Sequence, residues 1–138
     1  MARTVRNGLL ATASAALLLA AGAGTAQADT RQESFPGNWM MVAVMEGDDA
    51  FGPIDIESLH CPFLKGGHPD ASKACRELRK AGGDINKIPH KDVACPMIYK
   101  PVTAAAYGMW DDHRKVYAKQ FSNACAMHAE TGSVFKLK

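Results

Sequence analysis

The sequence predicts a small α+β domain built on an antiparallel sheet, preceded by an export signal and stapled by two disulfide bonds. Three observations lead to this prediction. Short apolar or alternating segments recur between turn residues, one segment has helical spacing, and the 138 residues include four cysteines. The composition is ordinary for a globular protein, with 47% apolar and 22% charged residues. It argues against a mainly disordered or collagen-like chain.

The first 28 residues have the three parts of a secretory signal peptide. Arg3 and Arg6 give a positive start, the run from Gly8 to Ala23 is apolar and uncharged, and Ala26-Gln27-Ala28 has the small-x-small pattern of a cleavage site. The apolar run is short for a membrane span. We therefore expect residues 1–28 to be removed and the domain of residues 29–138 to be secreted.

Removal of the signal changes the charge balance. It takes away two arginines and no acidic residue, so 14 basic and 14 acidic side chains remain. A protein without net charge offers no electrostatic reason to bind nucleic acid or an anionic membrane. We expect neither as its main ligand.

Five segments are predicted to be strands, because they are apolar runs between turn residues or alternate in polarity. They are residues 39–45, 53–59, 102–110, 115–121 and 132–137. The first is unbroken in its apolar character and predicts a buried strand. In the second, alternation places Ile54, Ile56 and Ser58 on one face.

One segment between these strands has helical spacing. Four small or apolar residues recur at such intervals: Ala71, Ala74, Cys75 and Leu78. Asp70 or Ser72 is expected to cap this helix, and Gly82-Gly83 to end it. A second, short helical turn is expected over residues 125–129, capped by Ser122.

An even number of cysteines in a small exported chain indicates disulfides rather than a metal site. There is no Cys-x-x-Cys pair, and five scattered histidines give no ligand set, so we interpret them as solvated or core-edge residues: His60, His68, His90, His113 and His128. We expect no metal. Four cysteines allow three pairings, and their order favours Cys61–Cys75 with Cys95–Cys125.

Sequence signatures of catalysis are missing. The chain has no Gly-x-Ser-x-Gly, no His-Glu-x-x-His and no phosphate-binding glycine loop. These absences make an enzyme the least favoured interpretation, and no cofactor is expected.

The most unusual segment is Cys95-Pro96-Met97-Ile98-Tyr99-Lys100-Pro101, in which two prolines bracket four residues, three of them large and apolar. Proline fixes its own φ and pushes the preceding residue toward extended geometry. On residue chemistry alone, a buried edge strand with irregular ends is favoured. The alternative is an exposed, rigid loop that offers Met97 to a partner's pocket, as a substrate-mimicking protease inhibitor requires.

With Val102 added, this segment resembles the reactive loop of the Streptomyces subtilisin inhibitor family. Further stretches are similar to that family: Gly67-His68-Pro69, Gly82-Gly83-Asp84-Ile85-Asn86, Phe121-Ser122-Asn123-Ala124-Cys125 and Gly132-Ser133-Val134-Phe135. The likeness runs from about Trp39 to Phe135 and includes the spacing of all four cysteines.

The resemblance implies a five-stranded antiparallel sheet with two short α-helices, and a homodimer formed through sheet faces. It also implies the disulfides Cys61–Cys75 and Cys95–Cys125. The implied function is secreted inhibition of subtilisin-like serine proteases.

For the loop, the resemblance places the scissile bond at Met97–Ile98. Met97 is then P1 and Ile98 is P1′, while Pro96 is P2 and Cys95 is P3. The remaining loop and support residues follow: Tyr99, Lys100, Pro101 and Asn123. Of these, Asn123 matches the residue that braces the loop from behind.

Two alternatives stay open at this point. The chain could be a secreted binding module without a protease partner, and a small hydrolase is a distant third. Members of the family also differ in whether they bind metalloproteases, for which the loop from Pro62 to Ala74 is a candidate second site.

Overall fold

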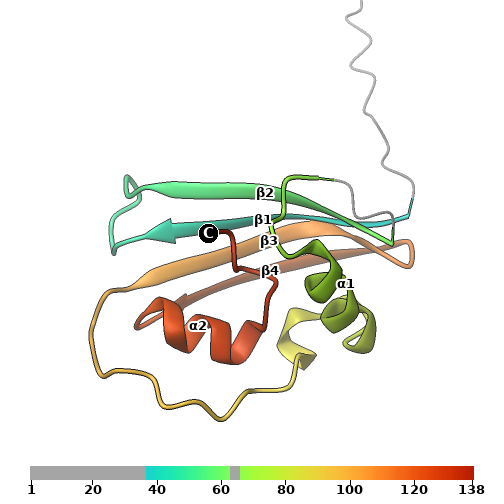
Figure 1. Ribbon diagram of the computed structural model, residues 1–138. Coiled ribbons are helices and arrows are strands. Elements are labelled where there is room, and N and C mark those ends of the chain that lie inside the picture. Colours follow the sequence, from blue (N-terminus) through green and yellow to red (C-terminus); the bar gives the residue numbers. More distant parts are fainter. Residues whose placement is uncertain (1–36, 63–65) are drawn as a thin grey trace, which may run out of the picture. The chain divides into compact units, whose positions relative to one another are not determined.

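A computed structural model describes residues 37–62 and 66–138, so the predicted signal peptide lies outside the described residues. The elements in chain order are β1 (Asn38–Glu46), β2 (Ile54–Cys61), α1 (Ala71–Lys80), the 3-10 turn η1 (Ile85–Lys87), β3 (Val102–Trp110), β4 (His113–Phe121) and α2 (Ala124–Thr131). The strands form one antiparallel sheet in the order β2-β1-β3-β4. Both helices lie on the same side of this sheet (Figure 1). The predicted α+β class is confirmed.

The sheet buries one face only. In β1, Met40 and Val42 are buried toward the helices, while Met41 on the opposite face is 39% exposed. The sequence predicts a buried strand here, but only alternate side chains are covered. Ile54 and Ile56 of β2 also point to the open face and are exposed. Within the described residues, no helix covers this second face (Figure 1).

Helix α1 follows the predicted spacing. Its buried residues are Ala74, Cys75 and Leu78. Asp70 stands at the position before the helix, as predicted, but its side chain makes no capping hydrogen bond. The predicted glycine stop is confirmed, with positive φ at Gly82 and Gly83. Gly83 is also required sterically, because a Cβ there would lie 2.2 Å from the Trp110 side chain.

The predicted last strand, residues 132–137, is wrong. Gly132, at φ 63°, ends α2, and the chain then continues through hydrogen-bonded turns. The N–H of Val134 donates to the carbonyl of Thr131, and that of Lys136 donates to Ser133. These bonds are local and replace pairing with a neighbouring strand. The adjacent residues Val134 and Phe135 are both buried, which strand alternation would not allow on one covered face.

The described chain therefore has four strands rather than the expected five. The cap of α2 also differs from the prediction, because Asn123 rather than Ser122 precedes the helix and accepts the Ala126 N–H. The two disulfides join the predicted cysteines. Cys61–Cys75 ties the end of β2 to α1, and Cys95–Cys125 ties the segment before β3 to α2.

Candidate functional site

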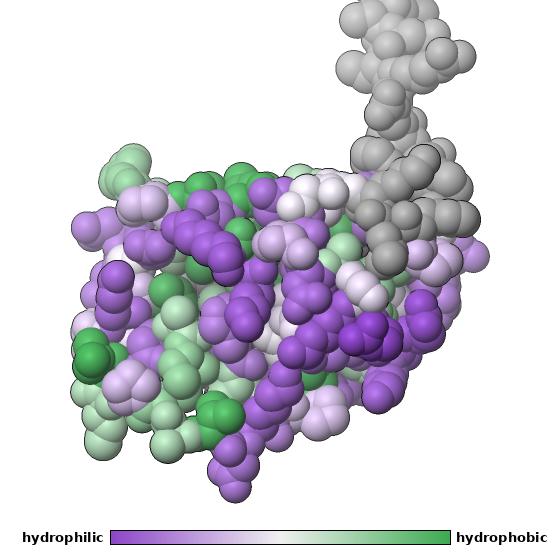
Figure 2. Space-filling model, viewed as in Figure 1, coloured by the Kyte–Doolittle hydropathy of each residue, from purple (hydrophilic) through white to green (hydrophobic). Residues whose placement is uncertain are grey.

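Residues 89–101 join η1 to β3 without helix or strand. They form a long arc that passes alongside α2 (Figure 1). The exposed fraction is 104% for Met97, 62% for Ile98 and 70% for Tyr99. The interpretation of this segment as a buried edge strand is therefore wrong. In Figure 2 mostly pale-green surface with a few strongly hydrophobic spots lies at the lower left, where Figure 1 places the part of the arc that leads into β3.

The part of the arc before Met97, residues 91–96, is here named the amino flank, and it is attached to α2. The Lys91 N–H donates to the carbonyl of Ala129 at 2.8 Å. Four residues later Cys95 is bonded to Cys125, with the two Cα atoms 5.6 Å apart. A single helix thus holds both ends of this flank.

Asn123 supports the arc directly beneath Met97. Its Nδ2 donates to the carbonyls of Pro96 at 3.1 Å and Ile98 at 3.0 Å. Its Oδ1 accepts the Ala126 N–H at 2.9 Å as the cap of α2. The buried side-chain amide of Asn123 therefore donates through its nitrogen and accepts through its oxygen, and these partners fix which atom is which. The main chain on both sides of Met97 is fixed from within, while the Met97 side chain points outward.

The part after the Met97–Ile98 bond, residues 98–101, is named the carboxyl flank. It leads into β3, and hydrogen bonds rather than a disulfide attach it to the body. The Tyr99 hydroxyl donates to Asp48 Oδ1 at 3.0 Å. The Lys100 N–H donates to the Ser122 carbonyl at 2.9 Å, and the carbonyl of Pro101 accepts the N–H of Gly47 at 2.9 Å. With the Asn123–Ile98 contact, each of these four consecutive residues accepts or donates one bond to the body.

Open space lies on both sides of the Asn123 support. One hollow of about 350 Å³ is bounded by residues 95–99 and the start of α2, and another of about 260 Å³ is bounded by Pro96, Ile98, Lys100 and the end of β1. Pro96, Ile98 and Asn123 line both hollows. Between the two hollows Asn123 joins the arc to the body, and the side chains of Met97 and Ile98 on the arc are exposed.

Two titratable groups near the arc have shifted pKa values. The hydrogen bond to Asp48 is the main cause that raises the pKa of Tyr99, because deprotonation would break that bond and place two negative charges together. Burial, followed by the positive charges of Lys136 and Lys91, lowers the pKa of His128. The Nδ1 atom of His128 is buried and has no hydrogen-bond partner within the described residues.

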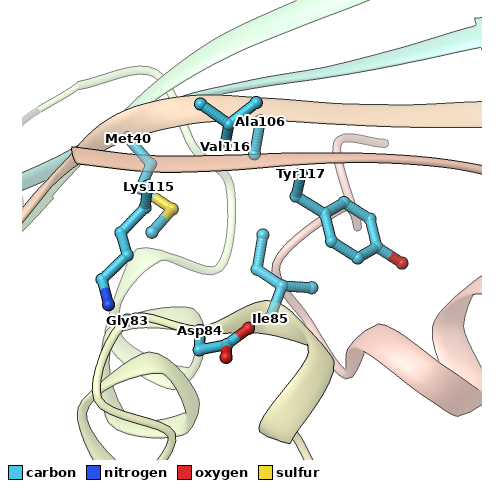
Figure 3. Close-up of a pocket in the computed structure, with 8 residues that line it drawn as sticks. All are labelled: Met40, Gly83, Asp84, Ile85, Ala106, Lys115, Val116 and Tyr117. Atoms are coloured by element: carbon cyan, nitrogen blue, oxygen red, sulfur yellow. The ribbon is translucent and has the colours of Figure 1, made fainter.

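One buried histidine and one small cavity belong to the core of the domain rather than to the arc. His68 is buried, and its Nδ1 accepts the Asp70 N–H at 3.1 Å, so Nε2 carries the proton and donates to the carbonyl of Val134 at 2.9 Å. In Figure 3, Met40 and Tyr117 extend from the sheet toward Ile85 around a cavity of about 20 Å³. That volume holds about one water molecule.

Two absences hold for the part of the chain that the structure describes. No three His, Cys, Asp or Glu side chains come together as a metal site there. None of the helices in that part has the length and apolar character needed to cross a membrane.

The structure brings together all the residues that the sequence assigned to the loop and its support. Sequence reasoning missed the contacts of the carboxyl flank with Gly47, Asp48 and the carbonyl of Ser122. No local pattern marks them, because Asp48 lies 51 positions from Tyr99. Only the sheet order, which sets the turn after β1 beside the start of β3, places these groups together.

Comparison with known proteins gives a consistent result. A family model described as subtilisin inhibitor-like matches residues 37–123. The chain is 42% identical over 85 residues to the subtilisin inhibitor of Streptomyces albogriseolus, covering 60% of this chain and 59% of that protein. It is 38% identical over 96 residues to subtilisin inhibitor-like protein 8 of Streptomyces virginiae, covering 65% and 86% of the two chains.

A solved structure is similar as well. It is the crystal structure of Streptomyces caespitosus sermetstatin in complex with Bacillus licheniformis subtilisin. The match has a TM-score of 0.57 and 28% sequence identity, and it covers 71% of this chain and 96% of the matched chain.

Proposed function

The chain belongs to the subtilisin inhibitor-like family, and from this premise we propose that it is a secreted inhibitor of subtilisin-like serine proteases. It acts as an inhibitor rather than as an enzyme. The arc of residues 95–101 binds in the protease cleft as a substrate would, with Met97 as P1 and Ile98 as P1′. The exposed Met97–Ile98 bond, supported from within by Asn123, is the observation that carries this proposal.

The geometry favours binding without a large ordering cost. A flexible peptide loses about 0.5–1.5 kcal/mol for each side chain that becomes immobilised, with backbone ordering in addition. Here the carbonyls of Pro96 and Ile98 are already fixed by Asn123, and Cys95 is fixed by its disulfide. Much of this cost is thus met during folding, before the protease is encountered.

Slow turnover follows from how the two sides of the bond are held. Attack by the protease serine would break the Met97–Ile98 amide and form an ester to the Met97 carbonyl. The Ile98 amine stays near that ester, because the carboxyl flank remains bonded to the body. Resynthesis of the amide then competes with attack by water, so the inhibitor is consumed slowly.

The nature of Met97 supports the choice of protease class. Its side chain is long, unbranched and apolar, and it extends fully into solvent. It suits a broad apolar specificity pocket, and it lacks the positive charge that the buried carboxylate of a trypsin pocket requires.

Homodimer formation is a further part of the proposal. The open face of the sheet carries exposed apolar residues on all four strands: Met41, Ile54, Ile56, Tyr107 and Val116. A second copy of the chain would cover this face. Val116→Asp on the outermost strand should lower the molar mass in light scattering from that of a dimer to that of a monomer. A wild-type protein that is monomeric at micromolar concentration would contradict this part.

A metalloprotease site between Pro62 and Ala74 stays a prediction. Residues 63–65 of that loop lie outside the described residues, and no contact in the rest of it bears on such a partner. Inhibition of a metalloprotease by a variant with Met97→Gly would support a second site.

Titration of subtilisin with the mature protein tests the main proposal. Residual activity should fall linearly to zero near one inhibitor chain per protease, and no substrate should be turned over by the protein alone. Met97→Gly is the matched variant, because it removes the P1 side chain and leaves both flanks in place. Unchanged subtilisin activity at a large excess of wild-type protein would leave the alternative, a binding module without a protease partner.

A further inference from the structure

The carboxylate of Asp48 joins three separate parts of the molecule. Asp48 lies in the turn between β1 and β2, and its Oδ1 accepts the Tyr99 hydroxyl at 3.0 Å. The same oxygen accepts Nε2 of Gln120, from β4, at 3.2 Å. The Gln120 contact helps to fix the carboxylate, and the carboxylate in turn fixes the Tyr99 ring.

This contact differs from the others that hold the carboxyl flank. Ile98, Lys100 and Pro101 are held through main-chain atoms, whereas Tyr99 is held through its side chain. The Tyr99–Asp48 hydrogen bond, called the tether below, can therefore be removed by a side-chain substitution that leaves the main-chain bonds in place. Tyr99 is also close to the reacting bond, since it is the second residue on the leaving side of Met97–Ile98.

We propose that Asp48, acting through Tyr99, is a positioning residue for resynthesis of the Met97–Ile98 bond. The inference rests on the proposed function. In the step concerned, the Ile98 amine nitrogen attacks the ester carbonyl carbon of Met97. The amide bond forms, the serine oxygen leaves and regains its proton, and the amine gives up one proton.

The tether matters most after cleavage. In the intact loop, the peptide bond itself keeps Ile98 next to Met97, so loss of one hydrogen bond changes little. In the cleaved protein the new amino terminus lies at the end of a four-residue segment before β3, and only hydrogen bonds keep that segment against the body. Loss of one of them gives the amino terminus freedom that the intact loop does not gain. Removing the tether should therefore shift the equilibrium between intact and cleaved inhibitor toward the cleaved form.

The experiment measures that equilibrium with a catalytic amount of subtilisin, approached from both the intact and the cleaved protein. Asp48→Ala and Tyr99→Phe should each raise the ratio of cleaved to intact inhibitor by about 2- to 10-fold, as expected for loss of one hydrogen bond. The double variant should match either single one, because both substitutions remove the same bond. Asp48→Asn, which keeps an acceptor oxygen, should restore much of the wild-type ratio.

Asp49→Ala is the matched control. It removes the neighbouring exposed carboxylate, whose side chain has no hydrogen bond or ion pair among the residues the structure describes, and the ratio should stay at the wild-type value. Equal thermal midpoints for all variants separate positioning from a general loss of stability. If Asp48→Ala behaves like Asp49→Ala while the wild type still inhibits, the role of Asp48 is overturned and the proposed function stands. If the wild type neither inhibits nor is cleaved at Met97–Ile98, the proposed function itself fails.

Discussion

The two flanks of the Met97–Ile98 bond are held in different ways. The amino flank has a covalent bond at Cys95 and is attached to one helix, α2. The carboxyl flank has hydrogen bonds in place of a disulfide, and these reach the turn after β1 as well as the start of α2. The difference corresponds to two needs of the proposed mechanism. A covalent link survives cleavage and keeps the pieces together, whereas dispersed weak bonds keep the leaving amine in position.

A substitution at Met97, between the flanks, should have the largest effect, because it changes which protease is bound and leaves the attachments of both flanks in place. Met97→Lys should raise affinity for trypsin by about 100-fold or more, since the new ammonium pairs with a carboxylate that is otherwise desolvated and unpaired. Inhibition constants against trypsin and subtilisin provide the measurement. If both constants stayed at their wild-type values, Met97 would not occupy P1.

The next largest effect should come from breaking the covalent anchor of the amino flank. The Cys95→Ser/Cys125→Ser double variant loses a bond that spans 30 positions, at a cost of about 3–4 kcal/mol in unfolding free energy. Cys61–Cys75 and the sheet should keep it folded. Inhibition should then be temporary, because cleavage at Met97–Ile98 is no longer followed by efficient resynthesis.

A time course of subtilisin activity, with mass spectrometry of the inhibitor, follows this change. Circular dichroism first establishes that the double variant is folded. A folded variant that stayed intact and inhibited as long as the wild type would show that the hydrogen bonds suffice without the disulfide.

Asn123 contacts both flanks, so its removal should weaken both by a moderate amount. Asn123→Ala loses two loop hydrogen bonds and a helix cap, and should lower the unfolding free energy by about 2–3 kcal/mol. It should also speed cleavage of Met97–Ile98 by subtilisin. Denaturant unfolding and cleavage rates measure the two effects.

Asn123→Asp separates the two roles of this residue. The carboxylate still accepts the Ala126 N–H, but it cannot donate to Pro96 or Ile98. Cleavage should therefore be as fast as in Asn123→Ala, while part of the lost stability returns. A slow rate of cleavage in Asn123→Asp would mean that the cap, rather than the loop bonds, protects the inhibitor.

The smallest effect should be the pH dependence of folding stability that comes from His128. This residue lies in α2, the helix to which the amino flank is attached. The folded pKa of His128 lies below its ordinary value of 6.5, so the unfolded chain takes up the proton first as the pH falls. The contribution of His128 to stability is complete above about pH 6.5 and is lost as the pH drops toward the folded pKa. Denaturation midpoints between pH 8 and pH 5 should decline less in His128→Asn. Parallel curves for the two proteins would contradict this prediction.

The predictable parts of the fold are those with strong local patterns. Four strands and α1 follow from polarity patterns and from Gly82-Gly83. The exposed loop follows from the family resemblance alone, because residue chemistry favours a buried edge strand there. The strand prediction for residues 132–137 was wrong because the short apolar pair Val134-Phe135 fits a strand as well as it fits a turn packed into the core. The choice of Asn123 over Ser122 as a cap depends on where the chain bends, and the Asp48–Tyr99 contact depends on sheet order. No local sequence pattern predicts the Asn123 cap or the Asp48–Tyr99 contact.

The strand order has a consequence for the protein after the protease has cut it. The bond at Met97–Ile98 divides the domain into two chains of similar architecture, one with β1, β2 and α1 and the other with β3, β4 and α2. Their shared seam is the central pair of the sheet, in register from Trp39 opposite Met109 to Glu46 opposite Val102. The two chains of a cut inhibitor are therefore joined twice, by the Cys95–Cys125 disulfide and by the β1–β3 pairing, and reduction of the disulfide alone would not separate them without opening the core.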